Sequence, residues 1–215
     1  MITLFSGTPG SGKSLHLARQ ILVHLRLKHY VIANFDLNRD MIKKWEDHFF
    51  FIPNDKLNPD DLKRFAISVF QGKRIKEDSI YLVIDESQML FNSREWGKSD
   101  RKPWLDFFTV HRHFGFHIVL VAQFDQMLDK QIRGLIEYEI IHRKVSNFGL
   151  KGWILSAVFL APSLFVAVKV WYPMSEKVDS EFFRYSKKFG QLYDSYALFS
   201  ADGAPVGAVS ALISE

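Results

Sequence analysis

Cysteine is absent from the 215-residue sequence, which excludes both disulfides and thiolate metal sites. The eight histidines show no spacing typical of metal ligands. Residues 1–6 lead directly into a glycine-rich motif, so we expect no secretory signal peptide. These absences fit a protein of the reducing cytosol.

A convincing membrane-spanning run is also missing, since a spanning helix needs roughly 20 apolar residues. Residues 153–168 carry no charge, but they number only 16 and contain Pro162 near their middle. Lys151, Lys169 and the tryptophans near both ends resemble interfacial anchors. On length we expect a buried hairpin here, with a membrane segment as the alternative.

The charge balance is modest, with a formal net charge of +4. Lysine and arginine gather at residues 94–102, 143–151 and 184–188. Such clusters permit contact with nucleic acid or anionic lipid, although a solvated face is the usual explanation of a charge run. The 20 phenylalanines indicate either a large aromatic core or an apolar surface that meets a partner or a membrane.

The first motif follows a short apolar run. Gly7-Thr-Pro-Gly-Ser-Gly-Lys-Ser14 matches the phosphate-binding pattern G-x-x-x-x-G-K-[ST], between a strand-like run and a helical pattern. Its glycines allow successive N–H groups to turn toward an anion, Lys13 would reach the β- and γ-phosphates, and the Ser14 hydroxyl would bind Mg²⁺. The alternative is a glycine-rich turn with a chance lysine. The match predicts a nucleotide-binding loop made of Gly7, Thr8, Pro9, Gly10, Ser11, Gly12, Lys13 and Ser14.

Polar residues follow two later apolar runs. Asp85 and Glu86 end the run at residues 80–84, where an acid would hold Mg²⁺ and its neighbour would polarise the attacking water. Gln123 ends the run at residues 117–122 and is a candidate to sense the γ-phosphate or orient water. A surface turn is the alternative for the acid pair, and a helix-capping amide is the alternative for Gln123.

Hydrolysis also needs a positive charge that stabilises the transition state, supplied by the same or a neighbouring subunit. Arg112 and Arg133 are the best placed by their order along the chain. The sequence does not choose between them, and either can instead form a structural ion pair.

Strand-like and helical patterns alternate in the first two thirds of the chain, which predicts a mostly parallel sheet in an α/β fold. Expected helices include residues 37–45, the segment from Asn58 to Gly72, and residues 103–113 and 124–132, with a mobile loop at residues 92–102. From residue 135 the pattern changes, and residues 136–145, 153–161 and 164–171 predict an antiparallel meander. We expect one domain over residues 1–199, whose β-rich part is residues 135–199, and a flexible tail at residues 200–215.

Taken together, these motifs resemble the zonular occludens toxin (Zot) family, whose members include morphogenesis ATPases of filamentous phages. The matching stretches are residues 2–14, Tyr81-Leu-Val-Ile-Asp-Glu-Ser-Gln88, residues 111–123 and Phe189-Gly-Gln-Leu-Tyr-Asp-Ser-Tyr196. The last of these is similar to the end of the family's ATPase domain. Longer members continue into a transmembrane helix and an outer domain, to which the toxin activity is attributed; we see no convincing spanning segment after Tyr196 and do not expect that activity.

The resemblance implies a P-loop NTPase fold of the RecA/FtsK-HerA kind, with Glu86 as catalytic base and Gln123 as polar sensor. It also implies ATP and Mg²⁺ as cofactors and a homo-oligomeric ring at the cytoplasmic face of the bacterial inner membrane. Single-stranded phage DNA and coat proteins would be its partners. A nucleotide-gated scaffold that binds membrane or coat proteins without hydrolysis is the alternative function. A P-loop kinase is disfavoured because no lid-like set of arginines is evident.

Overall fold

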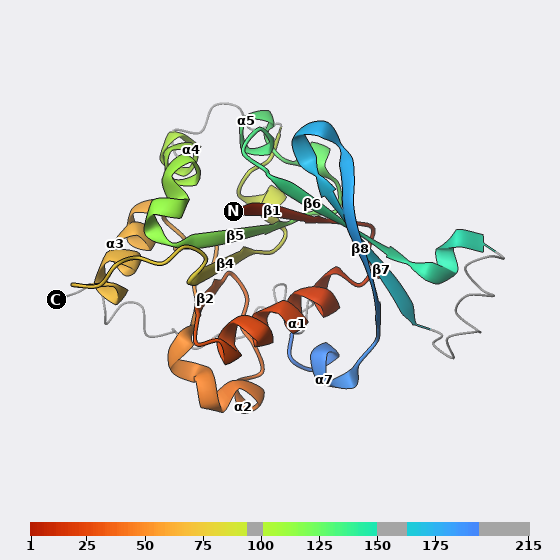
Figure 1. Ribbon diagram of the computed structural model, residues 1–215, viewed down its shortest axis with the longest axis horizontal. Helices are drawn as coiled ribbons and strands as arrows, with labels where there is room; N and C mark the ends of the chain where they lie inside the picture. The colour runs from red at the N-terminus through yellow and green to blue at the C-terminus, as the bar shows by residue number, and fades with distance from the viewer. Residues whose placement is uncertain (94–100, 150–162, 194–215) are drawn as a thin grey trace.

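The described part of the chain, residues 1–93, 101–149 and 163–193, forms one eight-stranded sheet in the computed structural model (Figure 1). The strand order is β3-β2-β4-β5-β1-β6-β7-β8. Neighbours from β3 to β6 in this order pair in parallel, whereas β7 and β8 pair antiparallel. The strands are β1 (Ile2–Ser6), β2 (Tyr30–Ala33), β3 (Phe49–Phe51), β4 (Ile80–Ile84), β5 (Phe116–Val121), β6 (Tyr138–Lys144), β7 (Leu164–Trp171) and β8 (Glu176–Arg184).

Helices cover both faces of the parallel part, which gives three layers (Figure 1). One face carries α1 (Lys13–Arg26), α2 (Arg39–Ile42) and α7 (Lys187–Gly190). The other face carries α3 (Pro59–Val69), α4 (Arg101–Val110) and α5 (Lys130–Arg133). Short 3-10 turns complete the chain: η1 (Lys43–His48), η2 (Ser87–Met89), η3 (His111–Phe114), η4 (Asp125–Met127), η5 (Val145–Phe148) and η6 (Tyr172–Met174).

The central strands are apolar on both faces because both faces are covered. On β4, Ile80, Leu82 and Ile84 pack toward α3 and α4, and Tyr81 and Val83 pack toward α1. This alternation directs the next side chain of the strand, at position 85, to the same face as α1.

The strand order and pairing confirm the α/β fold with a mostly parallel sheet and an antiparallel C-terminal meander.

Local chemistry explains where α3 begins. The side chain of Asn58 accepts a hydrogen bond of 2.8 Å from the backbone N–H of Asp60, and Pro59 occupies the first turn. The helix ends before Gly72, which adopts a positive φ of 72°. This helix was predicted correctly.

Other boundaries differ from expectation. The helix expected at residues 124–132 is split into η4 and α5, because Asp129 caps α5 through a 2.8 Å bond from the Gln131 N–H. The helix expected at residues 103–113 begins earlier, at Arg101, and gives way to η3 at His111. The helix expected at residues 37–45 is shorter than expected, because only α2 is α-helical and the 3-10 turn η1 follows it.

The meander contains one strand, β8, that was not expected. β6 pairs directly with β7, and the outer strand is β8, whose charged sequence hid it from the hydrophobic pattern. The strand expected at residues 153–161, most of the buried hairpin expected at residues 153–168 and the tail at residues 200–215 lie outside the described residues, as does most of the loop expected at residues 92–102. Among the described residues, no helix is both long enough and apolar enough to cross a membrane.

Candidate nucleotide-binding site

The glycine-rich motif forms a loop between the carboxyl end of β1 and the first turn of α1. The Gly7 N–H donates to the carbonyl of Gln123 at 3.0 Å, which ties the loop to the end of β5. Gly7 and Gly12 adopt φ angles of 139° and 95°, and a Cβ on Gly7 would lie 2.4 Å from the carbonyl oxygen of His142. A Cβ on Gly12 would lie 2.8 Å from the ring of Phe165, so both glycines are required by backbone angle and by space.

The side chain of Lys13 lies over this loop. Its ammonium donates hydrogen bonds to the carbonyls of Gly7 and Thr8. Burial lowers the pKa of Lys13, and the nearby carboxylates of Asp85 and Glu86 act in the opposite direction. The fold thus brings together the lysine of the loop and the acid pair, two features far apart in the sequence.

Asp85 is 5% exposed and tightly fixed. The side-chain amide of Asn34, at the end of neighbouring β2, accepts from the Asp85 N–H at 2.7 Å and donates to the Asp85 carbonyl at 2.8 Å. The carboxylate accepts from the Glu86 N–H at 2.8 Å and from the Tyr193 hydroxyl. Burial raises the pKa of Asp85, while these two donors and Lys13 favour its ionised form.

Glu86, the residue before the turn η2, has a left-handed conformation with φ of 47°. This angle is uncommon for a residue with a side chain and is typical of functional sites. The Gln88 side-chain amide donates to the Glu86 carboxylate, and the other amide atom of Gln88, Oε1, is buried without a hydrogen-bond partner among the described residues. Gln88 therefore restrains the direction of the Glu86 carboxylate.

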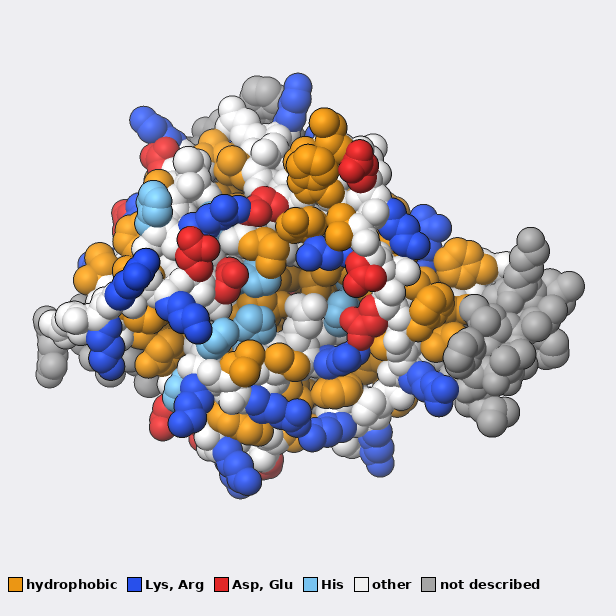
Figure 2. Space-filling model, in the orientation of Figure 1, with side chains coloured by type: hydrophobic (Ala, Val, Ile, Leu, Met, Phe, Trp, Pro, Cys, Tyr) orange, Lys and Arg blue, Asp and Glu red, His pale blue; other side chains and the backbone are white. Residues whose placement is uncertain are grey.

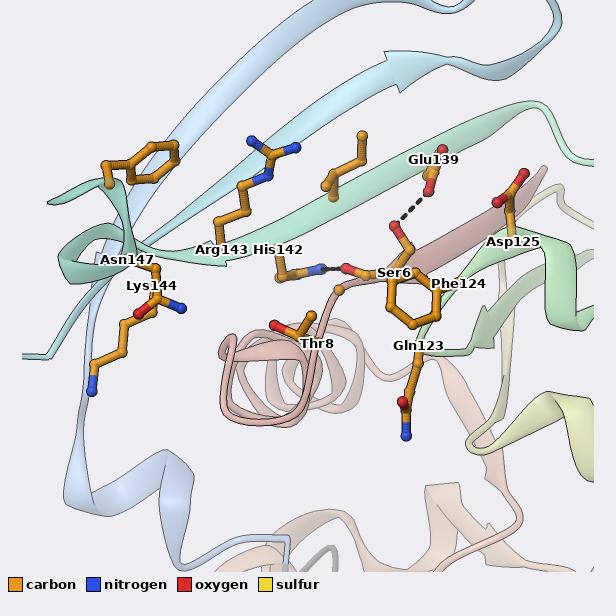
Figure 3. A pocket seen from close by; sticks show the side chains of 13 residues that line it. Ser6, Thr8, Gln123, Phe124, Asp125, Glu139, His142, Arg143, Lys144 and Asn147 are labelled. Carbon is orange, nitrogen blue, oxygen red and sulfur yellow. Dashed lines mark hydrogen bonds between the residues drawn. The ribbon is translucent and has the colours of Figure 1, made fainter.

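Gln123 is half-buried at the carboxyl end of β5, beside the loop. It borders a groove that Glu139 also lines, and in Figure 3 its side chain points away from Glu139. The candidate sensor therefore lies at the expected edge of the sheet.

The two candidate arginines lie in different places. Arg112 precedes β5, and its guanidinium pairs with Glu137 at 2.6 Å. Because β5 separates it from the loop, by about 20 Å for a strand of this length, Arg112 does not reach the phosphate loop of its own subunit. Arg133 Nη1 lies 3.7 Å from the Asp125 carboxylate, and its buried Nε has no hydrogen-bond partner among the described residues.

Two of the grooves lined by described residues lie beside the loop and along α1. A groove of about 420 Å³ borders the loop on the β6 side, where the Ser6 hydroxyl donates to Glu139 at 2.5 Å (Figure 3). Burial raises the pKa of Glu139, and the Ser6 bond opposes this. The second groove, of about 340 Å³, lies between α1 and β8; histidine side chains gather in the hollow of this face in Figure 2.

The donor set fits a magnesium nucleotide. A loop of backbone N–H groups with Lys13 suits phosphate oxygens, and the Ser14 hydroxyl and the Asp85 carboxylate would each supply an oxygen ligand of the kind that Mg²⁺ prefers. Magnesium in nucleotide sites is usually held by one or two protein groups together with phosphates and water. The described residues contain no cluster of three or more His, Asp or Glu side chains suited to a metal.

Sequence reasoning missed Asn34, Gln88 and Tyr193. Asn34 carried a detectable signal, because it directly follows an apolar run, at residues 30–33, in the same way as Asp85 follows the run at residues 80–84. Tyr193 lay within a stretch noted only for its resemblance to a family, and nothing in the sequence connected it with Asp85, which lies 108 positions away.

Solved structures with a similar fold are P-loop NTPases. The N-terminal domain of zonular occludens toxin from Neisseria meningitidis is 18% identical, with a TM-score of 0.51, over 90% of this chain and 98% of that one. The genome packaging NTPase B204 of Sulfolobus turreted icosahedral virus 2 is 16% identical, with a TM-score of 0.50, over 85% and 96% of the two chains. These likenesses show the P-loop NTPase fold.

Curated relatives are phage proteins that are longer than the matched region. Gene 1 protein of Escherichia phage If1 is 28% identical over 68% of this chain and 42% of its own length. Gene 1 protein of Enterobacteria phage I2-2 is 31% identical over 36% of this chain and 22% of its own length. The matches thus span less than half of these relatives. The family model for zonular occludens toxin (Zot) matches residues 1–198, and the chain belongs to this family.

Proposed function

We propose that the chain is a magnesium-dependent ATPase that drives the assembly or extrusion of filamentous phage. The observation that carries this proposal is the convergence of Lys13, Asp85 and Glu86 at the carboxyl edge of the sheet. A lysine over a glycine loop suits nucleotide phosphates, and a carboxylate pair on the adjacent strand suits metal binding and water activation.

Each residue has a separate role in this proposal. The loop and Lys13 would hold the phosphates, Ser14 and Asp85 would hold Mg²⁺, and the ion would supply positive charge to the phosphate oxygens. Glu86, restrained by Gln88, accepts the proton of the attacking water. Gln123, tied to the loop through its backbone, orients that water or contacts the γ-phosphate.

The arginine comes from a neighbouring subunit. The side chain of Arg112 is 52% exposed and lies at the amino end of β5, opposite the end that carries the loop. In an oligomer, Arg112 of one subunit can reach the phosphate loop of the next subunit. Arg133 is the second candidate, because its side chain is 28% exposed and its Nη1 lies 3.7 Å from Asp125, a loose contact that leaves the guanidinium able to meet another oxygen. An arginine in trans requires a homo-oligomer, and a ring is the arrangement that we propose.

Single-stranded phage DNA is the proposed substrate polymer, and the cytoplasmic face of the bacterial inner membrane is the proposed location. The support comes from the family and from the relatives in phages If1 and I2-2. The viral genome packaging NTPase resembles this chain in its fold alone, because the two are only 16% identical.

The decisive experiment measures ATP hydrolysis with and without single-stranded DNA, together with the mass of the nucleotide-bound protein. We expect stimulation by DNA and a ring-sized species. Lys13→Ala should abolish turnover, whereas Lys44→Ala, at an exposed lysine remote from the loop, should leave it unchanged. Unchanged turnover in Lys13→Ala would contradict the role of this loop.

A nucleotide-gated scaffold is the second candidate, favoured by exposed apolar side chains around the β7–β8 ribbon. Trp171, Met174, Val178 and Phe182 are 40%, 64%, 55% and 56% exposed. Apolar side chains gathered on a ribbon are typical of a surface that meets a protein or a membrane. A monomer that binds nucleotide tightly, ignores DNA and shows no turnover would favour this function over the motor.

A further inference from the structure

The chain beyond β8 returns from the outer edge of the sheet to the centre of the molecule. α7 lies beside α1 in Figure 1, and the Leu192 carbonyl then accepts from the Asn38 N–H at 2.9 Å. Leu192 and Tyr193 are 1% and 5% exposed, within the core under α1. This segment is therefore anchored in the core next to β2 and β4.

The ring of Tyr193 is fixed by packing. Its centroid lies 4.0 Å from that of Phe35, the second residue after β2. From this position the hydroxyl donates to Asp85 Oδ2, while the Glu86 N–H donates to Oδ1 at 2.8 Å. Both oxygens of the candidate metal carboxylate thus receive a hydrogen bond from a defined direction.

Two donors on the two oxygens determine the rotation of the carboxyl plane, which is otherwise a broad torsion. Each carboxylate oxygen has more than one lone-pair site, so both remain able to face a metal or its bound water. Asn34 already fixes the Asp85 backbone on both sides. The Tyr193 hydroxyl therefore adds what the backbone does not determine, the orientation of the carboxylate.

We propose that Tyr193 is a positioning residue that orients the Asp85 carboxylate for magnesium, which makes the segment after β8 a part of the nucleotide site. This inference rests on the proposed function, because it takes Asp85 as the metal carboxylate. Partners that orient a metal ligand typically change metal affinity 10- to 100-fold when they are removed.

The test compares Tyr193→Phe with Tyr81→Phe. The first change removes the hydroxyl and keeps the ring against Phe35. The second removes another buried tyrosine hydroxyl, which donates to Gln20 Oε1 at 2.7 Å and does not touch Asp85. Calorimetric titration of ATP, with magnesium and with EDTA, measures how much the metal strengthens binding, and paramagnetic resonance measures Mn²⁺ bound with the nucleotide.

In Tyr193→Phe, we expect the factor by which magnesium strengthens ATP binding to fall about tenfold or more, and the affinity for Mn²⁺ to fall by a similar factor. The affinity for ATP in EDTA should be unchanged. Tyr81→Phe should match the natural chain in both readouts. A Tyr193→Phe protein with natural metal dependence, or one whose loss is equalled by Tyr81→Phe, overturns the inference.

Asp85→Asn separates this inference from the proposed function. If Asp85→Asn keeps the natural metal dependence, Asp85 is not the metal carboxylate and the proposed site fails. If Asp85→Asn loses it and Tyr193→Phe does not, only the role of Tyr193 fails. In the Asp85→Asn background, removal of the Tyr193 hydroxyl should have no further effect on metal dependence, and an additive effect would show that Tyr193 acts elsewhere.

Discussion

The buried imidazoles of His16 and His142 share a hydrogen bond of 2.9 Å between Nδ1 and Nε2, directly beneath the phosphate loop. His142 Nδ1 lies 3.1 Å from the Ser6 carbonyl, and Gln20 Nε2 lies 3.1 Å from His16 Nε2. All three hydrogen bonds can form at once if both rings are neutral and carry their proton on Nδ1, so that each Nδ1 donates and each Nε2 accepts. A one-way chain of hydrogen bonds then runs from Tyr81 on β4, through Gln20, to the backbone at the end of β1.

This neutral pair predicts acid-sensitive stability. Burial lowers the pKa of His142 to about 3, well under the usual 6.5. The unfolded chain therefore takes up a proton below about pH 6.5 that the folded chain does not. The stability that the folded state gains from keeping this ring neutral is fully present above about pH 6.5. It is lost as the pH falls toward the pKa of the folded state, by about 1.4 kcal/mol per pH unit for each buried histidine of this kind.

Denaturant unfolding between pH 7 and pH 4.5 measures this loss. His142→Gln should unfold with a shallower dependence on pH than the natural chain, because it lacks one such group. His113→Gln, at an exposed histidine, should keep the natural slope. A free energy of unfolding that stays level from pH 7 to pH 5 would contradict the prediction.

Gly7→Ala should disable the loop. Its Cβ would collide with the His142 carbonyl oxygen, and its φ of 139° is strained for alanine. We expect at least a tenfold loss in nucleotide affinity. Gly72→Ala is the control, because Gly72 also has a positive φ, of 72°, but has open space around it. That change should cost about 1 kcal/mol of stability and leave nucleotide affinity unaltered.

Glu86→Gln should retain nucleotide binding and stop hydrolysis. The amide keeps the size of the carboxylate but cannot accept a proton from water. Single-turnover hydrolysis and calorimetric binding, measured on the same preparation, separate the two effects. Glu46→Gln, at an exposed glutamate, is the matched control. Persistent hydrolysis in Glu86→Gln would assign the base to another residue.

A mixture of two inactive variants tests the arginine in trans. Lys13→Ala lacks a working loop, and Arg112→Ala lacks the arginine that we assign to the neighbouring subunit. Mixed oligomers should regain part of the natural turnover, because some interfaces combine an intact loop with an intact arginine. Full activity of Arg112→Ala alone would instead favour Arg133.

Much of the site was predictable because its chemistry is local. The loop motif needs only eight consecutive residues, and Asp85 and Gln123 each end an apolar run that the hydrophobic pattern reveals. Parallel strands then place these ends at one edge of the sheet. The pairing of β1 with both β5 and β6 follows from tertiary packing, which no local pattern encodes.

The parts that escaped prediction depend on distant partners or on polar strands. β8 carries charges at most positions, so it lacks the alternation expected of a half-buried strand. The order along the chain suggested that Arg112 is close to the site. Arg112 precedes β5, however, whereas Gln123 follows it, so the two residues lie at opposite ends of this strand. Tyr193 reaches Asp85 only because the segment after β8 packs beside α1 and enters the core on that face of the sheet.

The position of β1 between β5 and β6 has a consequence for folding. Ile2 pairs with Ile118 and Thr3 with Tyr138, so the first strand finds both neighbours only after more than a hundred further residues. Such long-range pairings slow folding, because loop closure costs entropy before the contacts form. Nucleotide binding should therefore appear late in refolding, and a fluorescent nucleotide would report the closing of the central sheet.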